Sequence, residues 1–168
     1  MTLKELWNKN QYSTDKESTH HYLDTYDRLF APFQNKAINL FEVGIATGGS
    51  LKLWEDYFSK AFIWGIDIID EISYKYTNRV NWIQYDIKAW KDHQTTFDIA
   101  IDDGSHFIED QIVFFNNVWP ELNKGGLLII EDIDNIDQDK HFFDELNIPY
   151  EIIDLRGTYD SVLLIFRK

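Results

Sequence analysis

The sequence predicts an α/β fold in which helices cover both faces of a mostly parallel sheet. Short apolar runs recur along the chain, and stretches of helical length separate most of them. A glycine-rich turn follows the first run, as it does at the strand-to-helix turn of nucleotide-type sites. Two runs near the C-terminus follow each other directly and predict an antiparallel hairpin. With 168 residues, the chain is long enough for one domain with a substantial core.

The composition excludes several classes of protein. Hydrophobic residues make up 44% and aromatic residues 16% of the chain, which argues against disorder. There are no cysteines, so disulfides and thiolate metal sites are excluded. The formal net charge of −13 repels phosphate backbones, so we expect no nucleic-acid partner. The sequence shows no apolar run near the ~20 residues that span a membrane and no apolar signal-peptide core, so we expect a cytoplasmic protein without a membrane partner.

The single predicted domain comprises an N-terminal segment, residues 1–37, and a core, residues 38–168. Residues 14–16 are typical of a helix start. An amphipathic helix is then expected up to Pro32, which ends it. Its apolar positions at helical spacing are Tyr22, Tyr26 and Leu29. From spacing alone, this helix packs its aromatic stripe on the edge of the sheet.

The first strand is predicted at residues 38–43, an apolar run of the kind found in a strand covered on both faces. Glu42 lies near its end, where a buried carboxylate needs a partner. The glycines of the following turn are Gly44, Gly48 and Gly49. They allow a tight turn and a close approach of a ligand to the backbone. Ser50 is expected to help cap the next helix, whose apolar face is formed by Leu51, Trp54 and Phe58.

The residues of the glycine turn narrow its ligand. A dinucleotide fingerprint has G-x-G-x-x-G, but Ala46 stands where the middle glycine would admit a pyrophosphate. No G-K-[ST] follows, so the turn is not a P-loop. A turn preceded by an acid and without provision for a diphosphate suits a nucleoside that carries an amino acid, whose amino group can donate to Glu42. The alternative is a tight strand-to-helix turn with no ligand.

The second and third strands also end near acids. Residues 62–68 predict a strand with Asp67 at its end, about 20 residues beyond the glycine turn, from where an acid can bind ribose hydroxyls. A simple helix cap is the alternative role for Asp67. A short helix is expected at residues 70–79, and the third strand at residues 80–85 is followed by Asp86.

The fourth strand at residues 97–101 runs directly into the sequence DDGSH at 102–106. A helix follows, and Lys124-Gly125-Gly126 is expected to stop it before the fifth strand. That strand, at residues 127–130, ends in Glu131 and Asp132. The last predicted elements are a helix at about 138–146 and two strands at 150–155 and 161–166. Together they make a Rossmann-like sheet of seven strands with an antiparallel C-terminal hairpin strand.

In an open parallel sheet the ligand site lies outside the carboxyl ends of the strands, where the acids and glycines above all stand. Asp103, Glu131 and Asp132 come from adjacent strand ends, where carboxylates repel each other unless they are protonated or bridged by a cation. All-oxygen ligands select a hard cation, Mg²⁺ first, with Ca²⁺ or Mn²⁺ as alternatives. His106 follows Asp103 closely, and a neutral imidazole there can take a proton from a substrate hydroxyl. A surface or capping histidine is the alternative.

Several stretches of the chain resemble one family. The pattern E-x-G-x-x-x-G-x-S at residues 42–50 is similar to motif I of class I S-adenosylmethionine-dependent methyltransferases. TDK with HHYLDTYDRLF in the N-terminal segment, DDGSH after the fourth strand and IEDI after the fifth resemble the metal-dependent macrolide sugar O-methyltransferases of the macrocin and mycinamicin type. The resemblance runs from about residue 14 to residue 132 and so covers most of the chain.

The resemblance implies S-adenosylmethionine as cofactor, with the N-terminal segment closing over it. It also implies Mg²⁺ held by Asp103, Glu131 and Asp132, with His106 as general base beside the catalytic Asp103. An acid at the position of Asp86 commonly meets the adenine ring in this fold. The expected cofactor-binding residues are Thr14, Tyr22, Glu42, Gly44, Gly48, Ser50, Asp67, Ile68, Asp86, Ile87 and Asp102.

These observations predict a metal-dependent O-methyltransferase that acts on a hydroxyl of a sugar or of a glycosylated small molecule. A vicinal diol can chelate the metal through two oxygens, which favours sugars or catechols as acceptors. The alternatives are a methyltransferase that uses no metal and a catalytically silent module that binds S-adenosylmethionine; a nicotinamide dehydrogenase is disfavoured by Ala46. Several family members carry an extra N-terminal domain that we expect this chain to lack, and the segment after Asp132 is short. Acceptor identity and a homo-oligomeric state are therefore left open.

Overall fold

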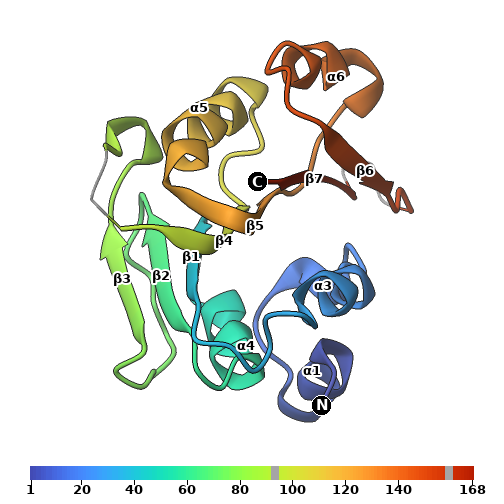
Figure 1. Ribbon diagram of the computed structural model, residues 1–168. Coiled ribbons are helices and arrows are strands. Elements are labelled where there is room, and N and C mark those ends of the chain that lie inside the picture. Colours follow the sequence, from blue (N-terminus) through green and yellow to red (C-terminus); the bar gives the residue numbers. More distant parts are fainter. Residues whose placement is uncertain (92–94, 158–160) are drawn as a thin grey trace.

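The computed structural model describes residues 1–91, 95–157 and 161–168, and a seven-stranded sheet forms its centre (Figure 1). The strands are β1 (Asn39–Val43), β2 (Phe62–Asp67), β3 (Val80–Gln84), β4 (Phe97–Asp102), β5 (Leu122–Ile130), β6 (Tyr150–Asp154) and β7 (Val162–Arg167). Their order across the sheet is β3-β2-β1-β4-β5-β7-β6. β1 to β5 pair in parallel, whereas β7 is antiparallel to both β5 and β6. The predicted Rossmann-like sheet with an antiparallel C-terminal strand is confirmed.

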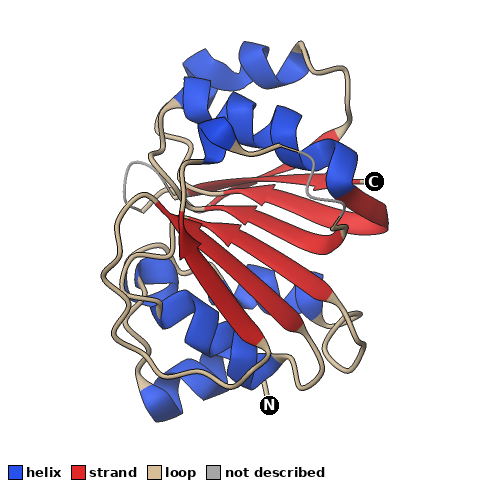
Figure 2. Ribbon diagram, turned by 90° about the vertical axis from the view of Figure 1, so that its left-hand side faces the viewer, coloured by secondary structure: helices blue, strands red, loops and turns tan. Residues whose placement is uncertain are grey.

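Helices cover both faces of this sheet, as the edge-on view of Figure 2 shows. The helices are α1 (Leu3–Asn10), α2 (Asp15–Ser18), α3 (Leu23–Phe30), α4 (Gly49–Tyr57), α5 (Ile108–Val118) and α6 (Ile136–Asp144), with short 3₁₀ turns η1 (Ile87–Ala89) and η2 (Trp119–Glu121). α1, α3 and α4 share one hydrophobic cluster with the sheet, and α5 and α6 share the other. No described helix is long and apolar enough to span a bilayer.

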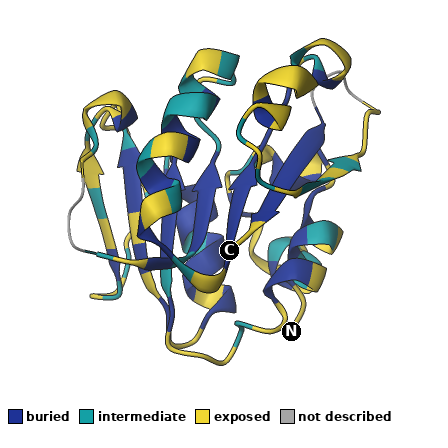
Figure 3. Ribbon diagram, turned by 45° about the horizontal axis from the view of Figure 1, so that its top comes forward, coloured by how far each residue is buried: buried dark blue, intermediate teal, exposed yellow. Residues whose placement is uncertain are grey.

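The two clusters follow from the alternation of side chains along the buried strands. In β1, Leu40 packs with Trp54 and Phe58 of the α4 side, while Phe41 packs with Phe97 on the α5 side. All five side chains are 1% exposed or less. Figure 3 shows the same pattern across the molecule, with buried central strands and exposed outer faces on the helices. The predicted apolar face of the helix after the glycine turn is therefore confirmed.

The N-terminal segment differs from the prediction. α1 was not expected, although Thr2 and Glu5 form a capping box at its start, which is a signal readable in the sequence. The single helix expected from residue 14 to Pro32 is two helices, α2 and α3. His21 stands between them with a φ of 59°, in the left-handed region that interrupts a helix.

Two further predictions, a helix at residues 70–79 and a helix end at Lys124-Gly125-Gly126, were wrong. Residues 70–79 form no helix, because this stretch bonds to the glycine turn and α4 instead: the Tyr76 hydroxyl donates to the Gly48 carbonyl and the Thr77 backbone to Glu55. β5 begins at Leu122, so the Lys124-Gly125-Gly126 sequence lies inside a strand rather than at a helix end. Gly125 adopts a φ of 83° there, beside an irregular β4–β5 register.

Ser50 does not cap the helix after the glycine turn. The N-cap is Gly48, whose φ of 88° suits a glycine, and Ser50 lies inside α4. A side chain on Gly48 would collide with the Tyr76 hydroxyl, because an added Cβ would lie 1.8 Å from it. The left-handed backbone therefore favours glycine at position 48, and a larger residue would also displace the Tyr76 hydroxyl.

Candidate active site

A cavity of about 940 Å³ opens at the carboxyl ends of β1, β2 and β4. The N-terminal segment forms one wall with Trp7, Tyr12 and Ser13, and the turn after β1 and the loop after β4 form the facing wall. The predicted site residues that line it are Thr14, Gly44, Ser50, Asp67, Ile68, Asp86, Ile87, Asp102, Asp103 and His106. The structure therefore brings most of the predicted residues to one cavity. Tyr22, Glu42, Gly48, Glu131 and Asp132 do not line it.

The turn after β1 fits tightly against the loop after β4. Gly44 has a φ of 80°, and an added Cβ would lie 1.8 Å from the backbone oxygen of Asp103. Asp67 accepts hydrogen bonds at one carboxylate oxygen from the backbone nitrogens of Ile45 (2.9 Å) and Ala46 (2.8 Å). Asp67 thus holds the turn in shape, and its predicted contact with ribose hydroxyls stays a prediction.

The predicted Glu42 carboxylate is fully buried beneath the cavity. One of its oxygens accepts hydrogen bonds from the Ser50 hydroxyl at 2.9 Å and from the Trp54 indole nitrogen at 3.0 Å. Its other oxygen lies 3.3 Å from the Lys16 ammonium. Burial raises the pKa of Glu42 to about 7, although Lys16 acts in the opposite direction. The partner that a buried acid needs here is Lys16, and a contact with a ligand amino group stays a prediction.

Asp102, a predicted cofactor-binding residue, lines the cavity and has one carboxylate oxygen that accepts no hydrogen bond from the described residues. It is 5% exposed, and one of its oxygens accepts from the Gly104 backbone nitrogen at 3.2 Å. Its other oxygen is buried and has no hydrogen-bond partner among the described residues. Burial raises the pKa of Asp102 to about 7, and Asp103 adds to the shift. A buried carboxylate oxygen without a partner at a cavity wall is suited to a donor on a ligand.

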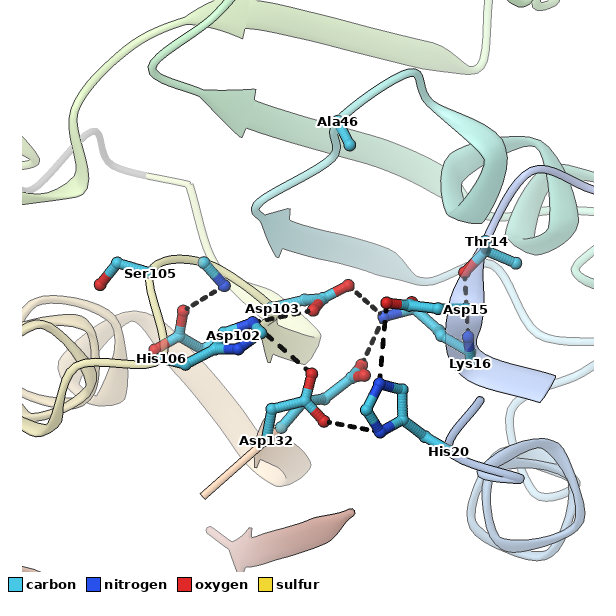
Figure 4. Close-up of polar contacts among 12 residues, drawn as sticks. Thr14, Asp15, Lys16, His20, Ala46, Asp102, Asp103, Ser105, His106 and Asp132 are labelled. Atoms are coloured by element: carbon cyan, nitrogen blue, oxygen red, sulfur yellow. Dashed lines mark hydrogen bonds and ion pairs between the residues drawn. The ribbon is translucent and has the colours of Figure 1, made fainter. Parts of the chain in front are cut away.

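Beside the cavity, the acidic residues after β4 and β5 meet the N-terminal segment (Figure 4). The Lys16 ammonium lies 2.6 Å from a carboxylate oxygen of Asp103 and 2.6 Å from one of Glu131. Tyr26 also donates a hydrogen bond to that oxygen of Glu131. Two of the three acids predicted to hold a metal are therefore bridged by a lysine of the same chain.

Asp132, the third of these acids, is held by a separate set of side chains. Its Oδ1 accepts from the Tyr22 hydroxyl at 2.6 Å, and the ring of His20 lies 3.4 Å from the same oxygen. Its Oδ2 lies 3.5 Å from Nε2 of His106. That nitrogen is also 3.6 Å from Oδ1 of Asp103. Tyr22 thus orients Asp132 and does not reach the cavity, where a cofactor contact was predicted for it.

The environment separates the pKa values of the three acids. Burial raises the pKa of Asp103, but Lys16 and His106 outweigh it, so the pKa lies below its usual range. Burial raises the pKa of Glu131 well above its usual range, and Lys16 offsets this only in part. Burial also raises the pKa of Asp132, against the hydrogen bond from Tyr22. Asp103 is therefore the acid that stays ionised most readily, next to His106.

Sequence reasoning missed the roles of Lys16, His20 and Tyr26. All three lie in the TDK and HHYLDTYDRLF stretches that carry the family resemblance, so a signal was present. Lys16 and Tyr26 contact Glu131, and His20 contacts Asp132 and Ser161. Each of these partners lies more than a hundred residues further along the chain, and local spacing does not show such contacts.

The chain is similar in sequence to curated O-methyltransferases. It is 33% identical to the 8-demethyl-8-alpha-L-rhamnosyl tetracenomycin-C 2'-O-methyltransferase of Streptomyces olivaceus, over 73% of this chain and 36% of that protein. It is also 33% identical to the demethylmacrocin O-methyltransferase of Streptomyces fradiae, over 74% of this chain and 35% of that protein. The chain thus spans about a third of the length of the curated relatives it matches. No family model matches it.

The structure agrees with this likeness. The MycE methyltransferase from the mycinamycin pathway, solved in complex with Mg and SAH, superposes with a TM-score of 0.76 and 25% sequence identity. The match covers 100% of this chain and 55% of that one. The chain is a relative of the macrolide sugar O-methyltransferases and has the class I methyltransferase fold. A further MycE complex contains Mg, SAH and mycinamycin VI, again with a TM-score of 0.76. The family resemblance that was inferred from the motifs of this chain is confirmed.

Proposed function

We propose that this chain transfers a methyl group from S-adenosylmethionine to a hydroxyl of a sugar or of a glycosylated small molecule. The observation that carries the proposal is the arrangement of Asp103, His106 and Asp132, whose ligand atoms lie within 4.8 Å of one another at the edge of the cavity. By their names, the two related enzymes are O-methyltransferases, one of them for a rhamnosyl tetracenomycin, and the MycE complexes contain SAH and Mg. The shared fold and the cavity support the same chemistry here.

The cavity fits the cofactor in two respects. The turn residues 44–47 line the cavity, and Asp102 offers a buried carboxylate oxygen without a hydrogen-bond partner among the described residues, suited to the amino group of the cofactor. Asp67 and Asp86 follow β2 and β3 and also line the cavity, and we propose that they contact the ribose and the adenine. When bound, S-adenosylmethionine supplies a methyl group on a positively charged sulfur. The described residues mainly bring the acceptor oxygen into line with it.

The donor set also fits a divalent cation. Asp103 and Asp132 supply carboxylate oxygens and His106 an imidazole nitrogen, and hard cations such as Mg²⁺ prefer the carboxylates. Bound there, a divalent cation lowers the pKa of an acceptor hydroxyl and orients it. We propose Asp103 and Asp132 as its ligands. The third predicted ligand, Glu131, bonds to Lys16 and Tyr26, and its contact with a metal stays a prediction.

His106 is the group placed to take the acceptor proton. Its side chain is 36% exposed at the cavity, and its Nε2 faces the carboxylates of Asp103 and Asp132. Those two carboxylates stabilise the imidazolium that forms when the proton is taken. His106 has a φ of 61° in the loop between β4 and α5, and it lines the cavity.

Methyl transfer without a divalent ion is a second candidate, favoured by one observation. The Lys16 ammonium already neutralises part of the charge of Asp103, Glu131 and Glu42. The two candidates differ in whether chelation abolishes turnover.

The first prediction concerns the cofactor. SAH, the demethylated product of S-adenosylmethionine, is expected to raise the melting temperature of the protein, because a ligand that binds only the folded state stabilises it by mass action. At a hundredfold excess over its dissociation constant the gain is about 2.7 kcal/mol, or roughly 5–11 °C for a chain of this size. Differential scanning calorimetry measures the shift.

NAD is the control ligand, and no shift is expected with it because Ala46 stands where a dinucleotide fingerprint has its middle glycine. The Asp102→Asn variant is expected to bind SAH about 10–100-fold more weakly, since a hydrogen bond to a charged group is worth about 1.5–3 kcal/mol. An unchanged melting temperature at millimolar SAH would refute the methyltransferase proposal.

A further inference from the structure

Lys16 carries an ammonium group in an unusual place for a lysine. Its side chain is completely buried, whereas lysines are almost never fully buried unless they are paired. Its partners come from three neighbouring strands: Glu42 from β1, Asp103 after β4 and Glu131 after β5. The Lys16 nitrogen lies 2.6 Å from Asp103, 2.6 Å from Glu131 and 3.3 Å from Glu42. Three carboxylates around one buried nitrogen favour its charged form, so Lys16 neutralises part of the charge of this acidic group.

The acids around this lysine form a second group with the spacing of a cation site. Ligand atoms of Glu42, Asp103 and Glu131 lie within 4.8 Å of one another, as do those of Asp103, His106 and Asp132. Asp103 belongs to both groups and uses its two oxygens differently. Its Oδ2 bonds to Lys16, and its Oδ1 faces His106. The two groups are thus neighbouring cation positions that share one carboxylate, and Lys16 stands in one of them.

We propose that the Lys16 ammonium is a built-in cation that fills the second of two adjacent cation positions, so that the protein binds one divalent ion instead of two. The inference rests on the proposed function for the first position, at Asp103 and Asp132. Lys16 acts through Asp103 and is a positioning residue: by holding Oδ2 it leaves Oδ1 for the side that faces His106.

Lys16 is covalently part of the N-terminal segment, so it can link this segment to the acids, which a free ion cannot do. α2, which carries Lys16, is capped by Thr14, and Thr14 and Asp15 line the cavity. The ammonium therefore ties this wall of the cavity to the ends of β1, β4 and β5. Because the ammonium belongs to a side chain of α2, it holds the N-terminal segment against the acids, whereas a second metal ion that can dissociate would not.

The number of bound ions tests the inference. Mn²⁺ titrated into wild-type protein is expected to bind at one site, with stoichiometry read by calorimetry and by the electron paramagnetic resonance signal of free Mn²⁺. Lys16→Met keeps an unbranched side chain as far as Cε and removes the ammonium, and it is expected to bind two ions. Lys16→Met combined with Glu42→Gln is expected to return to one ion, because Glu42 belongs only to the second group.

Two controls separate charge at this position from charge in general. Lys52→Met removes an equal charge from an ion pair with Glu55 and Asp56 on α4, and one ion is expected. The chain has no cysteine, so Lys16→Cys can be alkylated at a single site in denaturant and refolded. With 2-bromoethylamine it regains an ammonium and is expected to bind one ion; with iodoacetamide it stays neutral and is expected to bind two.

If Lys16→Met does not fold without metal, its melting is followed at rising Mn²⁺ concentration. The inference expects Mn²⁺ to restore folding to this variant, and failure to do so would contradict the inference. One ion of equal affinity in wild type and Lys16→Met would overturn the inference and leave the proposed function intact. No ion in either protein would overturn this inference and the proposed metal site, and would leave methyl transfer without a divalent ion as the candidate function. No ion in wild type and one in Lys16→Met would support the role of Lys16 and refute the proposed site at Asp132.

Discussion

Replacing His106 by asparagine is expected to lower the rate of methyl transfer by about 10²–10⁴-fold, or about 3–5 kcal/mol of barrier, while SAH affinity changes little. General-base catalysis contributes this much, and an amide cannot take the proton of the acceptor hydroxyl. Asparagine is the informative substitution because position 106 has a φ of 61°, a left-handed conformation that asparagine tolerates better than alanine. Single-turnover kinetics measure the chemical step directly.

His21 offers a matched control for this variant. It is an exposed histidine with a φ of 59°, and it lies outside the cavity. The same substitution, His21→Asn, is expected to leave turnover unchanged. A His106→Asn protein that transfers methyl groups within a few-fold of wild type would return this histidine to a capping role.

Asp132→Asn is expected to lower both Mn²⁺ affinity and turnover by more than about 100-fold. Loss of an outer-shell partner of a metal typically costs about 10–100-fold, and a direct ligand is expected to cost more. The backbone conformation, with a φ of 54°, suits asparagine, so the fold is expected to survive. Raising the metal concentration should restore part of the activity.

Asp134→Asn is the matched control, since it removes an equal charge from an exposed position close by in the sequence. It is expected to behave as wild type. Exhaustive chelation is the companion experiment: it should abolish turnover of the wild-type protein, with recovery on addition of Mg²⁺. Full activity after chelation would select the metal-independent alternative and would assign Asp103 and Asp132 to a structural role.

The sequence was sufficient to predict which residues at the strand ends lie together, because the strand topology determines that. Parallel strands that share a sheet bring their carboxyl ends to one edge, so Gly44, Asp67, Asp86 and Asp102 were bound to lie together once the strands were recognised. The glycine turn was recognisable from composition, and its close contact with the backbone of Asp103 is the physical reason that glycine is needed at position 44.

The partners of the acids could not be predicted in the same way. The residues nearest to Asp103, Glu131 and Asp132 include Lys16, Tyr22 and His20, which reach them from the N-terminal segment. Local patterns mark α2 and α3 as helices but do not show what their side chains touch. The wrong helix at residues 70–79 has the same origin, since Tyr76 and Thr77 bond across to the glycine turn and α4.

The central claim is that this chain methylates a sugar hydroxyl, and transfer of a labelled methyl group tests it most directly. The protein, Mg²⁺ and S-adenosylmethionine with a deuterated methyl group are incubated with a panel of glycosides that carry free vicinal diols, and the products are analysed by mass spectrometry. The proposal predicts that at least one glycoside gains a single deuterated methyl group, together with an equal amount of SAH, and that His106→Asn suppresses both. Binding of SAH without transfer to any glycoside, while another class of acceptor gains the label, would contradict the claim.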